Sequence, residues 1–338
     1  MKKKVVTLGE ILLRLSPPGN QRFINSTSFE INYGGAEINV AIDLANLGID
    51  TKLITKAPKN ELGDAALRHV KSYGVDTSNV ARDGDKIGTY FLETGFSVRG
   101  SKVLYDRKHS AFSKVSIDEF DLDKIFSDAS LFHVSGITLA VSQEAFELAE
   151  FFMKEAKKRD ILVSFDFNYR SKMWTLKEAS QGIEKILKYV DIALAGHLDF
   201  INILGLDMGE GYKRDNILDC YQILYPKVME KYNFKYIVSS VRKVVSASKN
   251  IYSGLLFNGE EIVSSREYDV DIIDRVGSGD AFTSGFLYGL LTEGNDNYKI
   301  EFAAASAVLK HTIPGDTNLV TKDEVESLFK GTGYDVGR

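Results

Sequence analysis

The sequence predicts an α/β fold with a parallel central sheet and a second, smaller sheet beside it. Short apolar runs alternate with longer amphipathic segments over most of the 338 residues. Two segments, 11–33 and 86–110, interrupt this alternation, and helical patterns fill the C-terminal part. Strands that alternate with helices of about 10–15 residues are typical of βαβ units, in which the strands run parallel.

Each strand of the alternating part is expected to be a short run rich in Val, Ile, Leu or Phe. Such runs suit strands that helices cover on both faces. Glycines mark the ends of the first two helices, at Gly48 and Gly74. We expect strands at 5–8, 52–55, 131–134, 161–165, 192–195 and 236–239, and helices at 36–47, 62–73, 144–157, 176–188, 217–231, 279–291, 300–311 and 321–329.

The two interrupting segments carry little helical periodicity and predict the smaller sheet. Residues 89–93 and 102–107 have the composition of strands, and the turn-rich residues 94–101 join them. Because residues two apart share a face of a strand, Tyr105 and Arg107 are expected to project the same way.

Composition limits the classes of partner. The chain is 44% hydrophobic and 26% charged, with a net charge of −5, so it lacks a bulk attraction for nucleic acid. An anionic ligand therefore needs local cations or backbone amides. The single cysteine, Cys220, excludes an intrachain disulfide framework, and no apolar run approaches the roughly 18 residues of a membrane span. We expect a cytoplasmic protein that binds neither nucleic acid nor membranes.

The strongest local motif lies between an extended segment and a helix. Gly277, Ser278 and Gly279 allow a tight turn whose N–H groups meet the positive end of the helix dipole, which suits a phosphoryl group. Asp280 follows at the mouth of this turn, where it is placed to accept a hydroxyl proton. The alternative is a plain helix N-terminus whose Asp only favours the dipole. No G-x-x-x-x-G-K-[ST] motif occurs in the chain.

Three other segments carry polar groups at element ends. A Gly pair (Gly34-Gly35) precedes the helix that contains Asn39, which allows a ligand close to the backbone but also suits an ordinary helix start. Residues 166–170 follow a strand, where ligands bind in open α/β sheets; the alternative is an Asp that caps a loop. Residues 310–316 end a helix with a Pro-Gly turn, and by themselves they indicate only a helix stop.

Taken together, these motifs resemble the two signatures of the ribokinase-like (PfkB-type) carbohydrate kinases. Within that family the chain is most similar to the kinases of 2-keto-3-deoxygluconate. The resemblance implies a Rossmann-like three-layer α/β/α core at 1–10, 34–85 and 111–332, with a β-sheet lid at 11–33 and 86–110. The residues that carry it are Gly34-Gly35-Ala36-x-x-Asn39-x-Ala41, Asp274-x-x-Gly277-Ser278-Gly279-Asp280, Leu8-Gly9-Glu10, Leu15-Ser16-Pro17-Pro18, 88–93, Tyr105-Asp106-Arg107, Asp166-x-Asn168-Tyr169-Arg170, Arg242, 246–248 and 311–316.

The resemblance also implies roles at matching positions. Asp280 takes the proton of the sugar acid's terminal hydroxyl as that oxygen attacks the γ-phosphate of ATP, and the amides of Gly277, Ser278 and Gly279 form an anion hole. The cofactors implied are ATP and Mg²⁺, with Asp199 as an indirect metal contact. Sugar-acid contacts are expected from Gly34, Tyr90, Tyr105, Arg107, Arg170 and Asp316, and nucleotide contacts from Asn168, Ser240, Arg242, Gly277 and Gly279.

The resemblance further implies a homo-oligomer, a dimer or larger, formed through the lid. One departure keeps alternatives open: Gly196 stands where the family usually has an Asn, three residues before the acid Asp199. The alternatives are a ribokinase-like kinase of another sugar, such as a ketohexose or a related keto-deoxy acid, and a sugar-acid-binding homologue with weakened catalysis.

Overall fold

The structure is a computed structural model that describes residues 3–208 and 217–332. Within these residues the main sheet has nine strands, and six of them run parallel in the order β4-β1-β9-β10-β11-β12. The predicted α/β class is therefore confirmed. The six strands are β1 (Lys4–Leu8), β4 (Asp50–Ile54), β9 (Ala129–Ser135), β10 (Leu162–Asp166), β11 (Ile192–Leu194) and β12 (Tyr236–Ser246).

One edge of the main sheet differs from the predicted parallel arrangement. β13 (Lys249–Phe257) pairs antiparallel with β12, and β14 (Ile262–Ser264) and β15 (Tyr268–Asp271) both pair antiparallel with β13. Only a tight turn separates β12 from β13, and so short a connection joins antiparallel strands, whereas parallel strands need a long crossover. The six strands expected from the sequence all run parallel, and the antiparallel pairing at this edge was not predicted.

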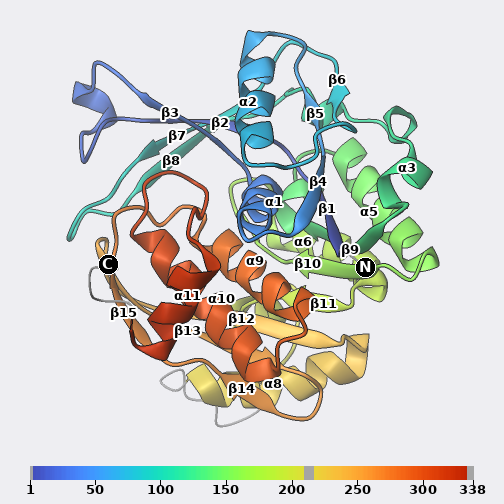
Figure 1. The fold of residues 1–338 in the computed structure, drawn as a ribbon, viewed down its shortest axis with the longest axis vertical. Helices are drawn as coiled ribbons and strands as arrows, with labels where there is room; N and C mark the ends of the chain where they lie inside the picture. Colours follow the sequence, from blue (N-terminus) through green and yellow to red (C-terminus); the bar gives the residue numbers. More distant parts are fainter. Residues whose placement is uncertain (1–2, 209–216, 333–338) are drawn as a thin grey trace.

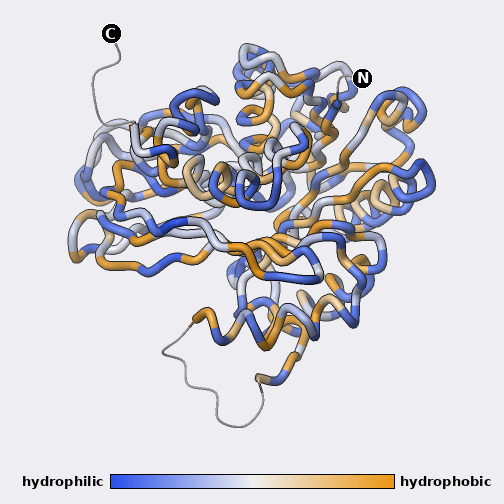
Figure 2. Tube along the Cα trace, turned by 60° about the horizontal axis from the view of Figure 1, so that its bottom comes forward, coloured by the Kyte–Doolittle hydropathy of each residue, from blue (hydrophilic) through white to orange (hydrophobic). Residues whose placement is uncertain are grey.

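Helices cover both faces of the sheet and make three layers (Figure 1). Successive strand residues point to opposite faces: Val6 and Phe132 join one core cluster, whereas Val5 and Leu131 join the other. Figure 2 shows hydrophobic residues gathered along the central strands. The first cluster includes α5 (Gln143–Lys158), α6 (Leu176–Ile186) and α8 (Ile217–Tyr232), and the second includes α1 (Ala36–Asn46), α9 (Ser278–Leu291), α10 (Asp296–His311) and α11 (Lys322–Lys330).

Hydrogen bonds with capping side chains fix where helices begin, as at the start of α6. The Thr175 side chain accepts the Glu178 N–H and the Glu178 carboxylate accepts the Thr175 N–H, a capping box that starts α6. No helix within residues 3–208 and 217–332 is both long and apolar enough to cross a membrane. The core also contains β5 (Lys56–Ala57), α2 (Glu61–Ser72), β6 (Ala81–Arg82), α3 (Leu122–Phe126), α4 (Gly136–Leu139) and α7 (His197–Asn202).

A separate four-stranded sheet extends from one side of the core, at the upper left of Figure 1. Its order is β3-β2-β7-β8, with β2 parallel to β7 and the other pairs antiparallel. We call this sheet the lid. It consists of β2 (Leu12–Ser16), β3 (Glu30–Gly34), β7 (Gly88–Glu93) and β8 (Lys102–Asp106), which lie in the two segments expected to form the smaller sheet.

The carboxyl ends of the parallel strands bring the polar segments together. β1 leads to Glu10, β10 ends at Asp166, and β11 leads to Gly196 and Asp199. Ligands of open α/β sheets bind at this edge.

Candidate active site

A cavity of about 930 Å³ lies at the carboxyl edge of the sheet, with residues of the lid in its wall. Its size suits two ligands of the dimensions of a nucleotide and a small sugar. Gly34 is absent from the lining, but it lies just behind the wall, because a Cβ at that position would come 2.5 Å from Asp316 Oδ2. Of the residues expected in the site, the lining contains Tyr90, Tyr105, Arg107, Asn168, Arg170, Asp199, Ser240, Arg242, Gly277, Ser278, Gly279, Asp280 and Asp316.

The glycine turn before α9 has the backbone conformation that its residues allow. Gly277 has φ +79°, in the left-handed region, and a Cβ there would lie 1.8 Å from the Asp316 carbonyl oxygen. The first turn of an α-helix leaves N–H groups without intrahelical acceptors, and those of Gly279 and Asp280 belong to that turn. An ideal Cβ on Gly279 meets nothing within 4 Å, so this backbone stands open to a ligand. The turn can therefore bind an anion.

Asp280 lies half-buried at this helix start. Asn39 Nδ2 donates a hydrogen bond of 2.6 Å to Asp280 Oδ2 and fixes the orientation of the carboxylate. Burial raises the pKa of Asp280 to about 7, although the Asn39 hydrogen bond and the Arg170 charge act in the opposite direction. A carboxylate with this pKa exchanges a proton near neutral pH, as a general base requires.

Two further carboxylates face the same cavity. Burial, together with the charges of Asp280 and Asp199, raises the pKa of Asp166 well above its ordinary value. Burial also raises the pKa of Asp199 to about 6, against the opposing effect of the Gly196 N–H, which donates 2.8 Å to Asp199 Oδ2. A cation bound beside these carboxylates would offset the repulsion that Asp280 and Asp199 exert on Asp166.

The cavity fits a magnesium ion held indirectly. Among the described residues no cluster of three or more His, Cys, Asp or Glu side chains is arranged to hold a metal. Mg²⁺ keeps several of its waters and takes one or two carboxylates together with substrate phosphates. Asp199 and Asp166 supply such carboxylates, and Asn168, whose N–H donates to Asp166 Oδ1 at 3.1 Å, holds the second of them in place.

The lid side of the cavity carries aromatic and cationic groups. The Tyr90 and Tyr105 rings lie 6.4 Å apart, and the Arg107 guanidinium lies 6.0 Å from the Tyr105 ring centre. Arg107 is not a free cation, because its Nε donates 2.8 Å to Glu10 Oε2 and its Nη2 bonds to the same oxygen. Arg170 is exposed at the cavity and makes no ion pair with another described residue.

The profile of the pfkB family carbohydrate kinases matches residues 2–323. The chain belongs to this family. It is a sugar kinase with the ribokinase-like fold, as the sequence predicted.

Named relatives of the kinase act on keto-deoxy sugar acids. It is 30% identical to the 2-dehydro-3-deoxygalactonokinase of Haloferax volcanii, over 100% of both chains. A crystal structure of the 2-dehydro-3-deoxygluconokinase of Thermotoga maritima is 42% identical, with a TM-score of 0.93 over 97% of this chain and 100% of that one. A structure assigned as Ribokinase II of Escherichia coli, in complex with ATP and Mg²⁺, shares the fold at 19% identity, with a TM-score of 0.80 over 97% and 99%.

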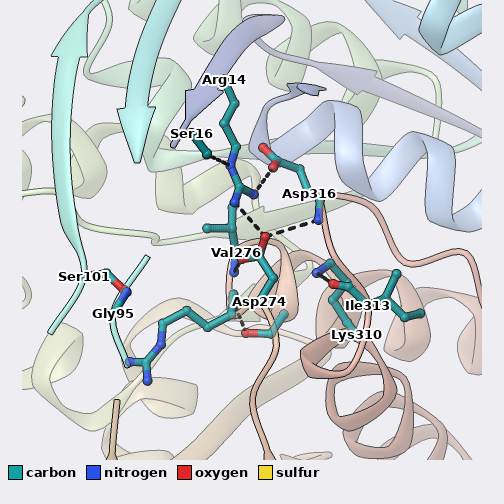
Figure 3. A network of polar contacts seen from close by, with 12 residues as sticks. Arg14, Ser16, Gly95, Ser101, Asp274, Val276, Lys310, Ile313 and Asp316 are labelled. Atoms are coloured by element: carbon teal, nitrogen blue, oxygen red, sulfur yellow. Dashed lines mark hydrogen bonds and ion pairs between the residues drawn. The ribbon is translucent and has the colours of Figure 1, made fainter. Parts of the chain in front are cut away.

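Several residues that hold the site of the kinase together were not predicted from the sequence. Arg14, Asp274 and Lys310 are buried around the anion-binding turn, and Glu10 is buried under Arg107. Figure 3 shows the first three with Asp316. A signal was present for Arg14 and Lys310, since each interrupts an apolar stretch at a position that its element buries. Their partners, however, come from distant parts of the chain.

Proposed function

We propose that this kinase transfers the γ-phosphate of ATP to the terminal hydroxyl of 2-keto-3-deoxygluconate, which is also named 2-dehydro-3-deoxygluconate. One observation supports this most: Asp280, with a pKa of about 7, lies at the anion-binding helix start, and cationic and aromatic groups line the same cavity. A sugar acid requires a cation for its carboxylate, and a kinase requires a base beside an anion hole.

In the proposed reaction Asp280 accepts the proton of the terminal hydroxyl. The hydroxyl oxygen forms a bond to the γ-phosphorus, and the bond from that phosphorus to the β–γ bridging oxygen breaks, so that ADP leaves with the electron pair. The N–H groups of Gly277 and Gly279 are proposed to meet the negative charge that develops on the phosphoryl oxygens, whereas the Ser278 N–H already donates 3.3 Å to the Arg275 carbonyl and has to turn from it to join them. Asp274 Oδ1 accepts the Val276 N–H at 3.0 Å and the Asp316 carbonyl packs against Gly277, so the turn needs little reorganisation in the transition state.

Two arginines are proposed to recognise the sugar acid. Arg170, which has no ion-pair partner among the described residues, binds the substrate carboxylate, and Arg107 contributes from its pair with Glu10. Tyr90, Tyr105, Asp316 and the backbone at Gly34 contact the remaining hydroxyl groups.

The nucleotide is proposed to lie on the other side of the anion hole. Asn168, Ser240 and Arg242 line the cavity and are proposed to contact the phosphates, together with Gly277 and Gly279. Mg²⁺, held indirectly by Asp199, supplies charge neutralisation on the phosphates. At Gly196, where the family usually has an Asn, the backbone N–H donates 2.8 Å to Asp199 Oδ2 and orients this carboxylate. A kinase that consumes ATP is expected in the cytoplasm.

A panel of acceptors tests the proposal. ADP release is measured with 2-keto-3-deoxygluconate, its C4 epimer 2-keto-3-deoxygalactonate, fructose and ribose, and the product is located by phosphorus NMR. We expect turnover of one or both keto-deoxy acids, with phosphate on the terminal carbon. Preference for the galactonate reassigns the substrate within the acids. Phosphorylation of neutral sugars alone contradicts the proposal, and tight sugar-acid binding without turnover favours a binding protein.

We also propose that a second copy of the chain covers the outer face of the lid. Ile31, Leu15, Phe91 and Leu104 form one row across the four strands in register, and Ile31 and Leu104 are 60% and 57% exposed. Phe29, 42% exposed, packs edge-on against Phe91 at 5.8 Å. An apolar row on a sheet face is typical of a surface that another chain covers.

A further inference from the structure

A buried polar network joins the lid to the anion-binding turn (Figure 3). Arg14, on the lid strand β2, donates from Nη1 to Asp316 Oδ1 at 2.6 Å and from Nη2 to Asp274 Oδ2 at 2.7 Å. Its Nε donates to Ser16 Oγ at 2.8 Å. All three charged residues are at most 5% exposed. We call this arrangement the Arg14 bridge.

The bridge holds two carboxylates that otherwise repel each other. Buried charges need a counter-charge, and removal of one partner leaves a costly unpaired ion. Lys310 is the second cation of this region; its Nζ donates 2.9 Å to the Ile313 carbonyl, and it lies under the turn, 3.4 Å from an ideal Cβ on Gly277. Arg14 itself is not among the residues that line the cavity, so it acts on ligands only through its partners.

Asp274 carries the effect of the bridge into the turn. Its Oδ1 accepts the Val276 N–H at 3.0 Å, directly before Gly277, and its Oδ2 accepts the Gly315 N–H at 3.2 Å. The Asp316 carbonyl packs so closely on Gly277 that no side chain fits there. The backbone of the anion hole is therefore held from both sides by residues that Arg14 binds.

The other end of the bridge lies at the proposed sugar site. Tyr90 stands opposite Arg14 in the pairing of β2 with β7, and its hydroxyl donates to Asp316 Oδ2. Two central lid strands thus contact one aspartate, through Arg14 and through Tyr90. A sugar acid that contacts Tyr90 and Asp316 also orders the groups that fix Arg14.

A second contact links the lid to the next residue of the turn. The Ser97 N–H donates 2.7 Å to Ser248 Oγ, and the Ala247 N–H donates 2.7 Å to the Ser97 carbonyl. Arg275 Nη2 donates 2.8 Å to the Ala247 carbonyl. The lid therefore reaches both Asp274 and Arg275, which are neighbours at the start of the turn.

We propose that Arg14 is a positioning residue that couples sugar binding by the lid to the geometry of the anion hole. The guanidinium binds Asp316, Asp274 and Ser16 from three separate nitrogens, whereas a Lys ammonium has all its donors on one nitrogen and lacks this fixed planar geometry. Because the anion hole acts on charge that develops in the transition state, its displacement lowers kcat more than it weakens ATP binding. This inference rests on the proposed function for the role of the turn.

The test compares wild type, Arg14→Lys and the control Arg99→Lys, on whichever acceptor of the panel wild type phosphorylates. Arg99 is a lid arginine whose guanidinium binds Glu93 and the Asn20 carbonyl and makes no hydrogen bond to Asp274, Arg275 or Asp316. We expect Arg14→Lys to lower kcat about 10- to 100-fold with the KM for ATP changed less than about threefold, whereas the control matches wild type. Binding of ADP with aluminium fluoride and sugar should weaken by the same factor as kcat falls, and binding of ADP alone should not.

A purely structural role for Arg14 lowers the melting temperature but leaves kcat unchanged well below that temperature. Unchanged kcat in Arg14→Lys therefore overturns the inference, and so does an equal loss of affinity for ADP alone. If Arg14→Lys does not fold, Asp274→Asn decides by the same measurements and the same criteria. Wild type that phosphorylates no keto-deoxy acid contradicts the proposed function instead, and leaves the comparison of variants valid on its actual substrate.

Discussion

Substitution of Asp280 by Asn removes the carboxylate proposed as the base and keeps a side chain of nearly the same shape. The Asn39 amide that donates 2.6 Å to the carboxylate is able to donate to the amide oxygen of the new side chain as well. We therefore expect the fold and ligand binding to persist. A positioned general base contributes about 10²- to 10⁴-fold to the rate, so kcat should fall by at least about 100-fold while both KM values change little.

The same substitution should stabilise the protein, with a defined pH dependence. The pKa of Asp280 is raised from 3.8 to about 7, so the folded chain binds this proton more tightly than the unfolded chain. Its contribution to stability is present at low pH and is lost as pH rises to about 7. One pKa unit corresponds to about 1.4 kcal/mol, which sets an upper limit of roughly 4 kcal/mol. Because the carboxylate faces an open cavity, we expect about 1–2 kcal/mol above pH 7 and none near pH 4.

Two measurements test the role of Asp280 as the base and its effect on stability. Coupled detection of ADP gives kcat and KM for wild type and Asp280→Asn, and urea unfolding at pH 4.5 and pH 8 gives the stability difference. For wild type, log kcat should rise with pH to a plateau above the pKa of Asp280. Near-normal turnover in Asp280→Asn refutes its role as the base. A stability gain of the same size at both pH values refutes the electrostatic reasoning.

Three further predictions follow from the geometry. Arg170→Ala should raise the KM for the sugar acid and move the acid limb of the kcat profile to higher pH, because the Arg170 charge lowers the pKa of Asp280; an unchanged limb contradicts this. Gly277→Ala should lower the melting temperature and should lower kcat at least tenfold, since its Cβ would lie 1.8 Å from the Asp316 carbonyl. A normal kcat in this variant contradicts the need for a fixed turn geometry. Leu104→Asp should convert an oligomer to a monomer in light scattering without loss of fold, and a wild-type monomer removes the proposed contact.

The repetitive part of the fold was predictable because its determinants are local. The helix expected at 36–47 is Ala36–Asn46, and the strand expected at 192–195 is Ile192–Leu194. A predicted helix boundary was wrong where a capping side chain determines the helix start. The helix expected from residue 300 begins at Asp296, because the Asn295 side chain accepts the Tyr298 N–H. Asn at an N-cap is a known signal that periodicity alone does not use.

The site was predictable only where its residues lie within short motifs. Gly277 and Asp280 belong to one turn, whereas Arg14 lies 260 and 302 residues from its two partners. No local pattern gives such a pairing, because it depends on how the lid packs on the core. The antiparallel strand β13 was not predicted for the same reason. Its place in the sheet depends on its pairing with β12, β14 and β15, which residue composition does not show.

The ion pair between Glu10 and Arg107 has a consequence for selectivity. Arg107 is 8% exposed and Glu10 is 3% exposed, so each satisfies the other before any ligand arrives. A neutral sugar in the cavity thus leaves no buried charge unpaired at Arg107, and this arginine by itself imposes no penalty on a substrate that lacks a carboxylate. A site rejects an analogue strongly when it leaves its own polar groups without partners. Discrimination between acids and neutral sugars is therefore expected to depend on Arg170, an exposed arginine of the cavity wall that makes no ion pair with another described residue.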